Sequence, residues 1–338
     1  MNILAAIKHE ERTLHNYGRK SAKQNRGKLM TPPSLTVACI GLGRIGSGIA
    51  HSVQNAGYQL IVYNRTPQKA QALIAGGAIA AETPREAAME ADIVITSLMD
   101  DASVLDNTVG DTGILAGLRP GAIHIGASTI SPKGTTQLAE LHKAHGSHYL
   151  AAPVAGHPHH AAAGKLLSFV AGESEAFERA RPVLEAYSAK IVRLDDVPAL
   201  ASSFKLVVNF FAACLLETIG EAFIFAEKQG IDLVVMSGML KDLLQHPALP
   251  AYLEKIRTRN FAEVLGSTLD GVGSKDVRII LQTAAEVHVP LPFASIVRDK
   301  IIAAQSLGFG EHDWSVLTEI SRLNAGQEPL AKAKIAAD

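Results

Sequence analysis

A chain of 338 residues is longer than one hydrophobic core usually supports, so its length predicts two domains. The composition, 47% hydrophobic and 19% charged, is that of an ordinary soluble globular protein. A formal net charge of −1 argues against a general electrostatic affinity for nucleic acid, and no unbroken apolar run reaches the roughly 18 residues of a membrane span. The two cysteines, Cys39 and Cys214, stand in apolar runs, which indicates reduced thiols in a cytoplasmic protein.

Residues 1–33 differ from the rest of the chain. Seven basic residues and two acidic ones fall within the first 30 positions, without the apolar core and cleavage site of a signal peptide. We interpret the segment as a basic extension, flexible or partly helical. Two alternatives stay open: an upstream start codon, with Met30 as the first residue of the folded protein, and an arm that contacts nucleic acid.

Residues 34–197 are predicted to form a Rossmann-type α/β domain with a mostly parallel sheet. Short apolar runs alternate there with helical patterns, as in successive βαβ units. Helix ends can be identified between these runs at Gly57, at Pro67 and at Thr83-Pro84. The predicted strands are Thr36–Ile40, Gln59–Tyr63, Ala78–Ala81, Asp92–Leu98, Ala122–Ile125, His148–Ala151, Leu167–Ala171 and Lys190–Leu194.

The first predicted strand runs directly into glycines at the spacing G-x-G-x-x-G, and a helical pattern follows. In a dinucleotide-binding loop Gly41 makes the tight turn, Gly43 lets the backbone approach a pyrophosphate, and Gly46 lets the helix lie close to the strand. The free N–H groups at the helix start then bind the phosphates. This context predicts a dinucleotide site, to which we also assign Arg44 and Ile45.

The end of the second strand indicates which dinucleotide binds. An NAD site usually has Asp or Glu there, about 20 residues after the loop, to hold the ribose 2′-hydroxyl. This strand ends in Asn64-Arg65-Thr66, without a carboxylate. Arg65 can pair with a 2′-phosphate, and Asn64 and Thr66 can donate hydrogen bonds to it. NADP(H) is therefore the predicted cofactor.

Residues 198–330 are predicted to form an all-helical domain that begins with a helix of about 30 residues. An apolar stripe at three-and-four spacing suggests the packed face of this helix. Further helices are predicted from a Ser274 cap to Val289-Pro290, over Phe293–Leu307, and from near Asp313. The stripe consists of Phe204, Val207, Val208, Phe211, Leu215, Ile219 and Ala222.

Together these features resemble the β-hydroxyacid dehydrogenase family over about Leu35 to Gln327, including the 3-hydroxyisobutyrate dehydrogenases and the glyoxylate/succinic semialdehyde reductases. The resemblance implies a 6-phosphogluconate dehydrogenase-like fold with a long interdomain helix, and a homodimer or homotetramer built through the helical domain. Besides the glycine loop, four motifs carry the resemblance: Ser128-Thr-Ile-Ser-Pro132, Ala152-Pro-Val-Ala-Gly156, Lys205-Leu-Val-Val-Asn209 and Ser274-Lys-Asp276.

The resemblance implies roles for residues in these motifs. Lys205 matches the catalytic lysine, with Asn209 one helical turn further on the same face. Thr129, Lys275, Leu98 and Met99 are expected to contact the cofactor. An ammonium beside the nicotinamide can stabilise the negative charge that reduction leaves on a carbonyl oxygen, and can donate the proton as general acid.

The substrate loop departs from the family pattern. Relatives usually have Asp-Ala-Pro-Val-Ser-Gly-Gly, in which the serine holds the substrate carboxylate, whereas this chain has Ala155, Gly156 and His157 at the last three positions. We expect Ser128 and Pro153, with these three residues, to line the substrate site. His157, His159 and His160 lack the further ligands of a metal site, so no metal is predicted. Asp313 and Ser315 either reach the cleft or cap a helix.

The predicted activity is reversible hydride transfer between NADP(H) and a small aldehyde, semialdehyde or β-hydroxyacid. Imine reduction is the alternative on the same fold. Imine reductases typically have Asp or Tyr in place of the lysine, which this chain retains as Lys205. A non-catalytic NADP-binding scaffold is the third possibility. Neither a nucleic acid nor a membrane is an expected partner.

Overall fold

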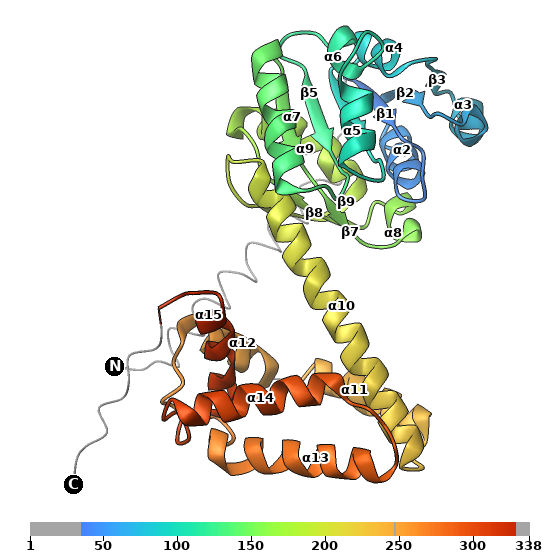
Figure 1. The fold of residues 1–338 in the computed structure, drawn as a ribbon. Helices are drawn as coiled ribbons and strands as arrows, with labels where there is room; N and C mark the ends of the chain where they lie inside the picture. Colours follow the sequence, from blue (N-terminus) through green and yellow to red (C-terminus); the bar gives the residue numbers. More distant parts are fainter. Residues whose placement is uncertain (1–34, 247, 329–338) are drawn as a thin grey trace, which may run out of the picture. The chain divides into compact units, whose positions relative to one another are not determined.

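In the computed structural model of the protein, residues 35–246 and 248–328 are described, so the basic extension predicted for residues 1–33 lies outside them. The chain divides into two compact units, with the division after Asn209. The sequence placed the second domain from residue 198, at the start of the long helix, whereas the units divide within that helix. Each unit is described separately (Figure 1).

A six-stranded parallel sheet forms the centre of the first unit, in the order β3-β2-β1-β4-β5-β6. Because both faces of such a sheet are covered, its strands are almost continuously apolar, and this made them predictable. The strand order reverses beside β1, between β2 and β4, as in Rossmann folds. The strands are β1 (Thr36–Ile40), β2 (Gln59–Tyr63), β3 (Ile79–Ala80), β4 (Ile93–Thr96), β5 (Ile123–Gly126) and β6 (His148–Ala151).

A smaller sheet in the order β7-β8-β9 continues the first unit. β8 (Leu166–Val170) and β9 (Ser188–Arg193) are parallel and correspond to the last two predicted strands. The prediction missed β7 (Val154–Ala155), which pairs antiparallel with β8. With only two residues, β7 has too few positions to show a strand period.

Helices cover both faces of the large sheet (Figure 1). One face packs apolar side chains of α2 and α9 against β1, β4 and β5, and the other packs α4 and α6 against Val94 and its neighbours. Cys39 is buried in the first of these layers and Cys214 is half-buried, both as free thiols. The helices are α2 (Gly46–Asn55), η1 (Pro67–Ala70), α3 (Gln71–Ala75), α4 (Pro84–Met89), α5 (Asp101–Thr108), α6 (Ile114–Gly117), α7 (Pro132–His145), α8 (Pro158–Ala162) and α9 (Ser174–Tyr187).

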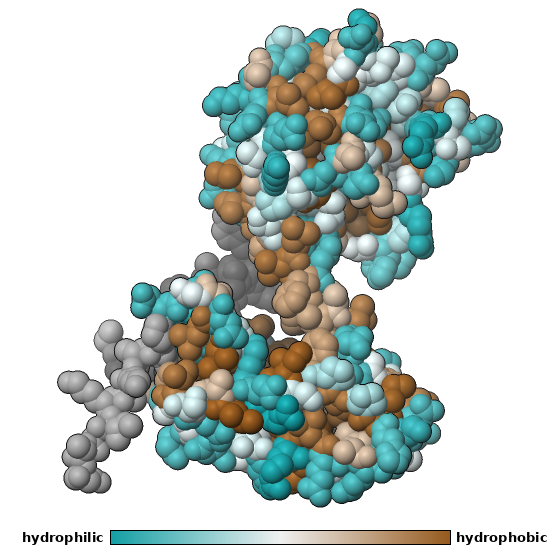
Figure 2. All heavy atoms as spheres, viewed as in Figure 1, coloured by the Kyte–Doolittle hydropathy of each residue, from teal (hydrophilic) through white to brown (hydrophobic). Residues whose placement is uncertain are grey.

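The long helix, α10 (Ala199–Lys228), has 30 residues, as the sequence predicted. Its packed face was predicted wrongly: Val207 and Phe211 of the apolar stripe are exposed, while Ala201, Ser202 and Lys205 are buried. The reason is that the first turns pack on the Rossmann-type unit through Ala201 and through a 2.6 Å hydrogen bond between Ser202 and Thr135. Apolar side chains are therefore visible along α10 in Figure 2.

The length and mean hydropathy of α10 would also suit a membrane span, a property that core helices of soluble proteins share. In this chain the first turns of α10 carry a buried lysine and a buried serine that is hydrogen-bonded to α7. The first turns of α10 are therefore packed against protein.

The second unit is helical and packs around Phe261, Leu269, Ile301 and Phe309. The helix predicted from Ser274 exists, but Gly273 occupies the cap position and the Ser274 side chain makes no capping bond, so this detail was wrong. The elements after α10 are α11 (Leu233–Leu244), α12 (Ala248–Thr258), η2 (Leu269–Gly273), α13 (Ser274–Glu286), α14 (Pro292–Ser306), η3 (Trp314–Thr318) and α15 (Glu319–Asn324).

Candidate active site

The carboxyl ends of the parallel strands bring the predicted cofactor residues to one edge of the sheet. Backbone hydrogen bonds continue past the strand ends at this edge: Gly41 N–H donates to Tyr63 C=O at 3.0 Å, and Ser97 N–H donates to Ile40 C=O at 3.0 Å. Ala127 N–H donates to Thr96 C=O at 2.9 Å. The loops after β1, β2, β4 and β5 are therefore held side by side, where α/β sheets bind ligands.

The glycine loop after β1 has the close contacts that only glycine permits. A Cβ on Gly46 would lie 2.0 Å from the carbonyl oxygen of Gly41, and one on Gly41, where φ is +91°, would lie 2.4 Å from the oxygen of Ser97. A Cβ on Gly43 would meet nothing within 4 Å, so the loop surface is open there. Ile45 stands at the cap of α2, whose first turn holds no acidic residue, and Arg44 is exposed. This loop fits a dinucleotide phosphate at the helix start.

The end of β2 contributes one structural residue and one free cation. Asn64 Oδ1 accepts the Leu42 N–H at 2.9 Å, and Asn64 Nδ2 donates to Thr66 C=O at 2.9 Å, so this amide shapes the glycine loop. The contact of Asn64 with a 2′-phosphate stays a prediction. Arg65 and Thr66 are exposed, and within residues 35–246 and 248–328 no partner binds the Arg65 guanidinium.

A hydrogen bond connects the loops after β4 and β5. Ser128, which is buried, accepts the Leu98 N–H on its Oγ at 2.8 Å. Met99 is 85% exposed, an unusual position for a large apolar side chain, and Thr129 is exposed beside Ser128. Ser128 thus positions the β4 loop, and its hydroxyl proton stays available to another acceptor.

The predicted substrate loop follows β6. Pro153 is buried, Ala155 is half-buried, and Gly156 and His157 are exposed. The rings of His157, His159 and His160 lie with centroids 4.0–5.8 Å apart on or beside α8. His160 Nδ1 accepts the His157 N–H at 3.1 Å, which fixes the start of α8. Among the described residues no group of three or more potential ligands has the arrangement of a metal site.

Lys205 occupies an unusual place for a lysine. It lies one turn beyond Ala201, whose hydrophobic cluster includes Ile130 and Tyr149, and its side chain is only 7% exposed. Burial lowers the pKa of Lys205 below its ordinary value, because an ammonium loses hydration there. No residue that the structure describes accepts a hydrogen bond from Lys205 Nζ. Asn209 is exposed.

The remaining predicted residues lie in the helical unit. Lys275, the second residue of α13, is 3.3 Å from the Asp276 carboxylate, and both are exposed. Asp313 and Ser315 form a helix cap, the second of the two predicted alternatives. The buried Asp313 carboxylate accepts the Ser315 N–H at 3.0 Å and the Leu265 N–H at 2.8 Å.

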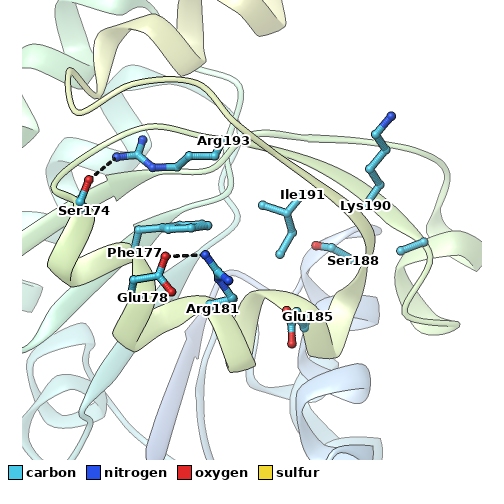
Figure 3. A pocket seen from close by; sticks show the side chains of 10 residues that line it. Ser174, Phe177, Glu178, Arg181, Glu185, Ser188, Lys190, Ile191 and Arg193 are labelled. Atoms are coloured by element: carbon cyan, nitrogen blue, oxygen red, sulfur yellow. Dashed lines mark hydrogen bonds and ion pairs between the residues drawn. The ribbon is translucent and has the colours of Figure 1, made fainter. Parts of the chain in front are cut away.

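A hollow of about 500 Å³ lies between α9 and β9 (Figure 3). Its cations are already compensated: Arg181 pairs with Glu178, and Arg193 with Asp196 and the Gly172 carbonyl. Both guanidinium groups also lie over the Phe177 ring, at 5.0 and 5.2 Å from its centroid. None of the predicted site residues lines this hollow, so it is a separate feature.

Comparisons with known proteins agree with this architecture. Residues 36–194 match the family model for the NAD binding domain of 6-phosphogluconate dehydrogenase. Residues 200–320 match the model for the NAD-binding of NADP-dependent 3-hydroxyisobutyrate dehydrogenase.

The match to two curated relatives covers almost the whole length of each. The oxidoreductase YfjR of Bacillus subtilis is 38% identical over 84% of this chain and 98% of its own. The 3-sulfolactaldehyde reductase of Escherichia coli is 29% identical over 88% of this chain and 99% of its own. A solved imine reductase from Myxococcus stipitatus in complex with NADP+ has a TM-score of 0.75 at 23% identity, over 85% of this chain and 99% of that one, a likeness of fold alone.

The glycine loop, the sheet order and the family models thus point to the same conclusion. The first unit is a binding domain for a nicotinamide dinucleotide, and the chain is an oxidoreductase. Both family models match in the expected order along the chain. This chain therefore belongs to the β-hydroxyacid dehydrogenase family.

Proposed function

We propose that the protein is an NADP(H)-dependent reductase of a small aldehyde or semialdehyde, which also catalyses the reverse oxidation of the corresponding hydroxy compound. The observation that carries the proposal is the buried Lys205, which has no hydrogen-bond partner among the described residues. A lysine this little exposed, without an ion-pair or hydrogen-bond partner among the described residues, loses hydration that nothing replaces, and such groups concentrate at functional sites.

The proposed cofactor is NADP(H). Its phosphates would bind at the open loop around Gly43 and the start of α2, and its 2′-phosphate would pair with Arg65. The absence of a carboxylate at the end of β2 supports NADP(H) over NAD(H). Bound there, the nicotinamide would supply or accept the hydride, while the protein supplies position and charge.

Lys205 would act on the substrate oxygen. Reduction of a carbonyl leaves negative charge on that oxygen, and the ammonium stabilises the charge and donates a proton to it. In the oxidation direction the neutral amine accepts the hydroxyl proton. Burial lowers the pKa of Lys205, so the ammonium gives up its proton more readily and the neutral amine is present at a lower pH. Low solvation also strengthens the interaction of the ammonium with the developing negative charge.

A small substrate fits both the relatives and the loop after β6. The name of the 3-sulfolactaldehyde reductase supports an aldehyde. Ala155 has no hydroxyl for a substrate carboxylate, which leaves Ser128, the backbone around Gly156 and the exposed His157 as proposed anchors. Because the missing hydroxyl removes a contact for a substrate carboxylate, it also favours a substrate without one, and a cyclic imine is the second candidate.

The decisive experiment is a steady-state screen of the purified protein with NADPH against aldehydes, semialdehydes, ketoacids and cyclic imines. Turnover of an aldehyde supports the proposal, whereas turnover of imines alone would replace it with the alternative. Tight NADPH binding without turnover of any of these compounds would indicate a non-catalytic scaffold.

Lys205→Ala tests the proposed proton donor. We expect this variant to keep its NADPH affinity and to lose at least about 100-fold in kcat for aldehyde reduction, the usual contribution of a general acid. Lys190→Ala removes an exposed lysine on β9 and serves as the matched control, with unchanged activity. Wild-type activity in Lys205→Ala would refute the role of this lysine.

A further inference from the structure

A chain of buried hydrogen bonds crosses the first unit from β4 to the turn before β6. Thr96 Oγ1 lies 2.9 Å from His124 Nε2, His124 Nδ1 lies 2.9 Å from His142 Nε2, and His142 Nδ1 lies 2.8 Å from Ser147 Oγ. Thr96, His124 and His142 have no exposed surface. None of these residues was singled out from the sequence, and the proposed reaction does not use them directly.

Both imidazoles are neutral in this environment. Burial lowers the pKa of His124 well below its ordinary value, and burial together with His145 and His148 lowers the pKa of His142 to about 3. The Tyr149 ring packs against both imidazoles, at centroid distances of 5.1 and 5.5 Å. The Asp101 carboxylate near Tyr149 accepts the Ser131 N–H at 2.8 Å, and no carboxylate in the described chain is hydrogen-bonded to either ring.

Because each neutral ring has one N–H donor and one acceptor nitrogen, all the hydrogen bonds of this network must be donated in the same direction. If His124 donated to Thr96, the buried Thr96 O–H would find no acceptor among the described residues, a costly arrangement. In the opposite direction Thr96 donates to His124, His124 to His142, and His142 to Ser147. The Ser147 O–H then has two possible acceptors, His145 Nδ1 at 3.2 Å and the His142 carbonyl at 3.4 Å. Only this direction satisfies every donor, with both rings as Nδ1–H tautomers.

This chain of hydrogen bonds lies directly beneath the candidate site. Thr96 is the last residue of β4 and pairs with Gly126 at the end of β5, two residues before Leu98 and Ser128 respectively. A Cβ on Gly126 would lie 2.2 Å from the Tyr149 hydroxyl. Tyr149, which packs against both histidines, therefore also packs closely against the backbone at the end of β5. Tyr149 belongs to the same hydrophobic cluster as Ala201, one turn before Lys205.

We propose that His124 and His142, held as Nδ1–H tautomers by their hydrogen bonds to Thr96 and Ser147, are positioning residues that fix the carboxyl ends of β4 and β5 for catalysis. Their tautomers follow from the structure alone, whereas their effect on turnover rests on the proposed function. Neither ring is a catalytic residue, because the chain ends at the Thr96 hydroxyl below the edge of the sheet.

Nitrogen NMR of the histidine rings in the intact protein tests the first part without any substrate. We expect His124 and His142 to show the Nδ1–H tautomer and to remain neutral from about pH 8 to about pH 5. His142→Gln and His124→Gln assign the signals. An Nε2–H tautomer, or titration of either ring near pH 6.5, would overturn the proposal.

Thr96→Val tests the positioning role, because valine keeps the shape of threonine and removes only the donor to His124. Ser188→Ala is the matched control: it removes one buried hydroxyl from the 2.6 Å Ser168–Ser188 pair in the small sheet. We expect Thr96→Val to lower kcat/KM with NADPH by at least about fivefold, since small displacements of reacting groups reduce rates strongly. Ser188→Ala should stay within about twofold of wild type even where its melting temperature falls equally.

The two proposals fail in different ways. If Thr96→Val and Ser188→Ala have the same kinetics, the buried hydrogen bonds from Thr96 to Ser147 serve stability alone, and the positioning role is overturned. If the wild-type protein turns over no carbonyl or imine compound, the proposed function fails. In that case the readout is the NADPH dissociation constant of Thr96→Val against Ser188→Ala. A larger loss in Thr96→Val supports positioning of the cofactor edge, and equal values overturn it.

Discussion

Lys205 is the residue on which the proposed chemistry depends, and its burial predicts a pH profile. Reduction needs the ammonium, so kcat/KM for the aldehyde should fall as pH rises through the pKa of Lys205. Burial lowers this pKa from the ordinary value of 10.5, so the inflection should lie below that value. Oxidation of the alcohol needs the neutral amine and should rise through the same pKa.

Lys205→Arg serves as the control for this profile, since a guanidinium keeps its charge but does not give up its proton. Its reduction rate should be low and should show no fall at high pH. The profile is measured as kcat/KM, which reports the free enzyme. A reduction rate of the wild type that increases with pH across the same range would contradict the assignment of the proton to Lys205.

Arg65 is the residue that we propose to distinguish NADPH from NADH. Its exposed guanidinium, free of protein partners in the described chain, is available to a 2′-phosphate. A hydrogen bond to a charged group contributes about 1.5–3 kcal/mol, so Arg65→Ala should raise the Kd of NADPH by at least about tenfold. The Kd of NADH should change little, and Arg181→Ala, which removes an arginine paired with Glu178 on α9, should affect neither. Equal losses for both dinucleotides would remove the case for NADP(H).

At the scale of elements, the buried imidazoles between β5 and α7 predict acid sensitivity. Their pKa values are lowered on folding, so below about pH 6.5 the unfolded chain takes up protons that the folded chain does not. Stability is therefore fully present above about pH 6.5 and is lost as the pH falls toward the lowered pKa values. Each ring makes the free energy of unfolding fall by up to about 1.4 kcal/mol per pH unit in that range.

Urea unfolding at several pH values measures this slope. His142→Leu removes one of the two rings, so its free energy of unfolding should depend less steeply on pH than that of the wild type, even though its absolute value is lower. The same slope in both proteins would show that the buried rings are not the cause.

The elements also show how far the sequence could be interpreted. Buried parallel strands are continuous apolar runs and could be recognised, whereas β7, with two residues, could not. For α10 the length was predictable but not the packed face. A lysine ordinarily points to solvent, and only the fold shows that Lys205 lies on the buried side beside Ser202. The bond of Asn64 to Leu42 could not be predicted for a similar reason, because it depends on how the loop after β1 folds back to β2.

The buried histidines illustrate a signal that was present in the sequence but was not used. His124 stands between Ile123 and Ile125 in a strand that had to be buried on both faces. A polar residue in such a strand requires a partner, yet the partner lies 18 positions away on α7, and no spacing rule connects the two. The candidate site was easier to predict, because its glycine loop is local in sequence.

At the scale of the whole molecule, the exposed apolar side chains of the helical unit favour self-association. Phe210 and Leu216 on α10 are each 70% exposed and Val234 on α11 is 81% exposed, more apolar surface than a monomer ordinarily leaves in water. We propose that a second copy of the chain covers this surface, as the family resemblance implies. Cyclic symmetry would then let the same patch pair with itself.

Sedimentation velocity at assay concentration tests this assembly, and we expect at least a dimer. Phe210→Glu and Leu216→Glu place a charge in the proposed contact, and each should shift the equilibrium toward monomer, because burying an unpaired carboxylate opposes association. Lys190→Glu, which changes an exposed residue of the first unit, should leave the assembly intact. A wild-type protein that sediments as a clean monomer would rule out the dimer and would require another partner for the apolar face of α10.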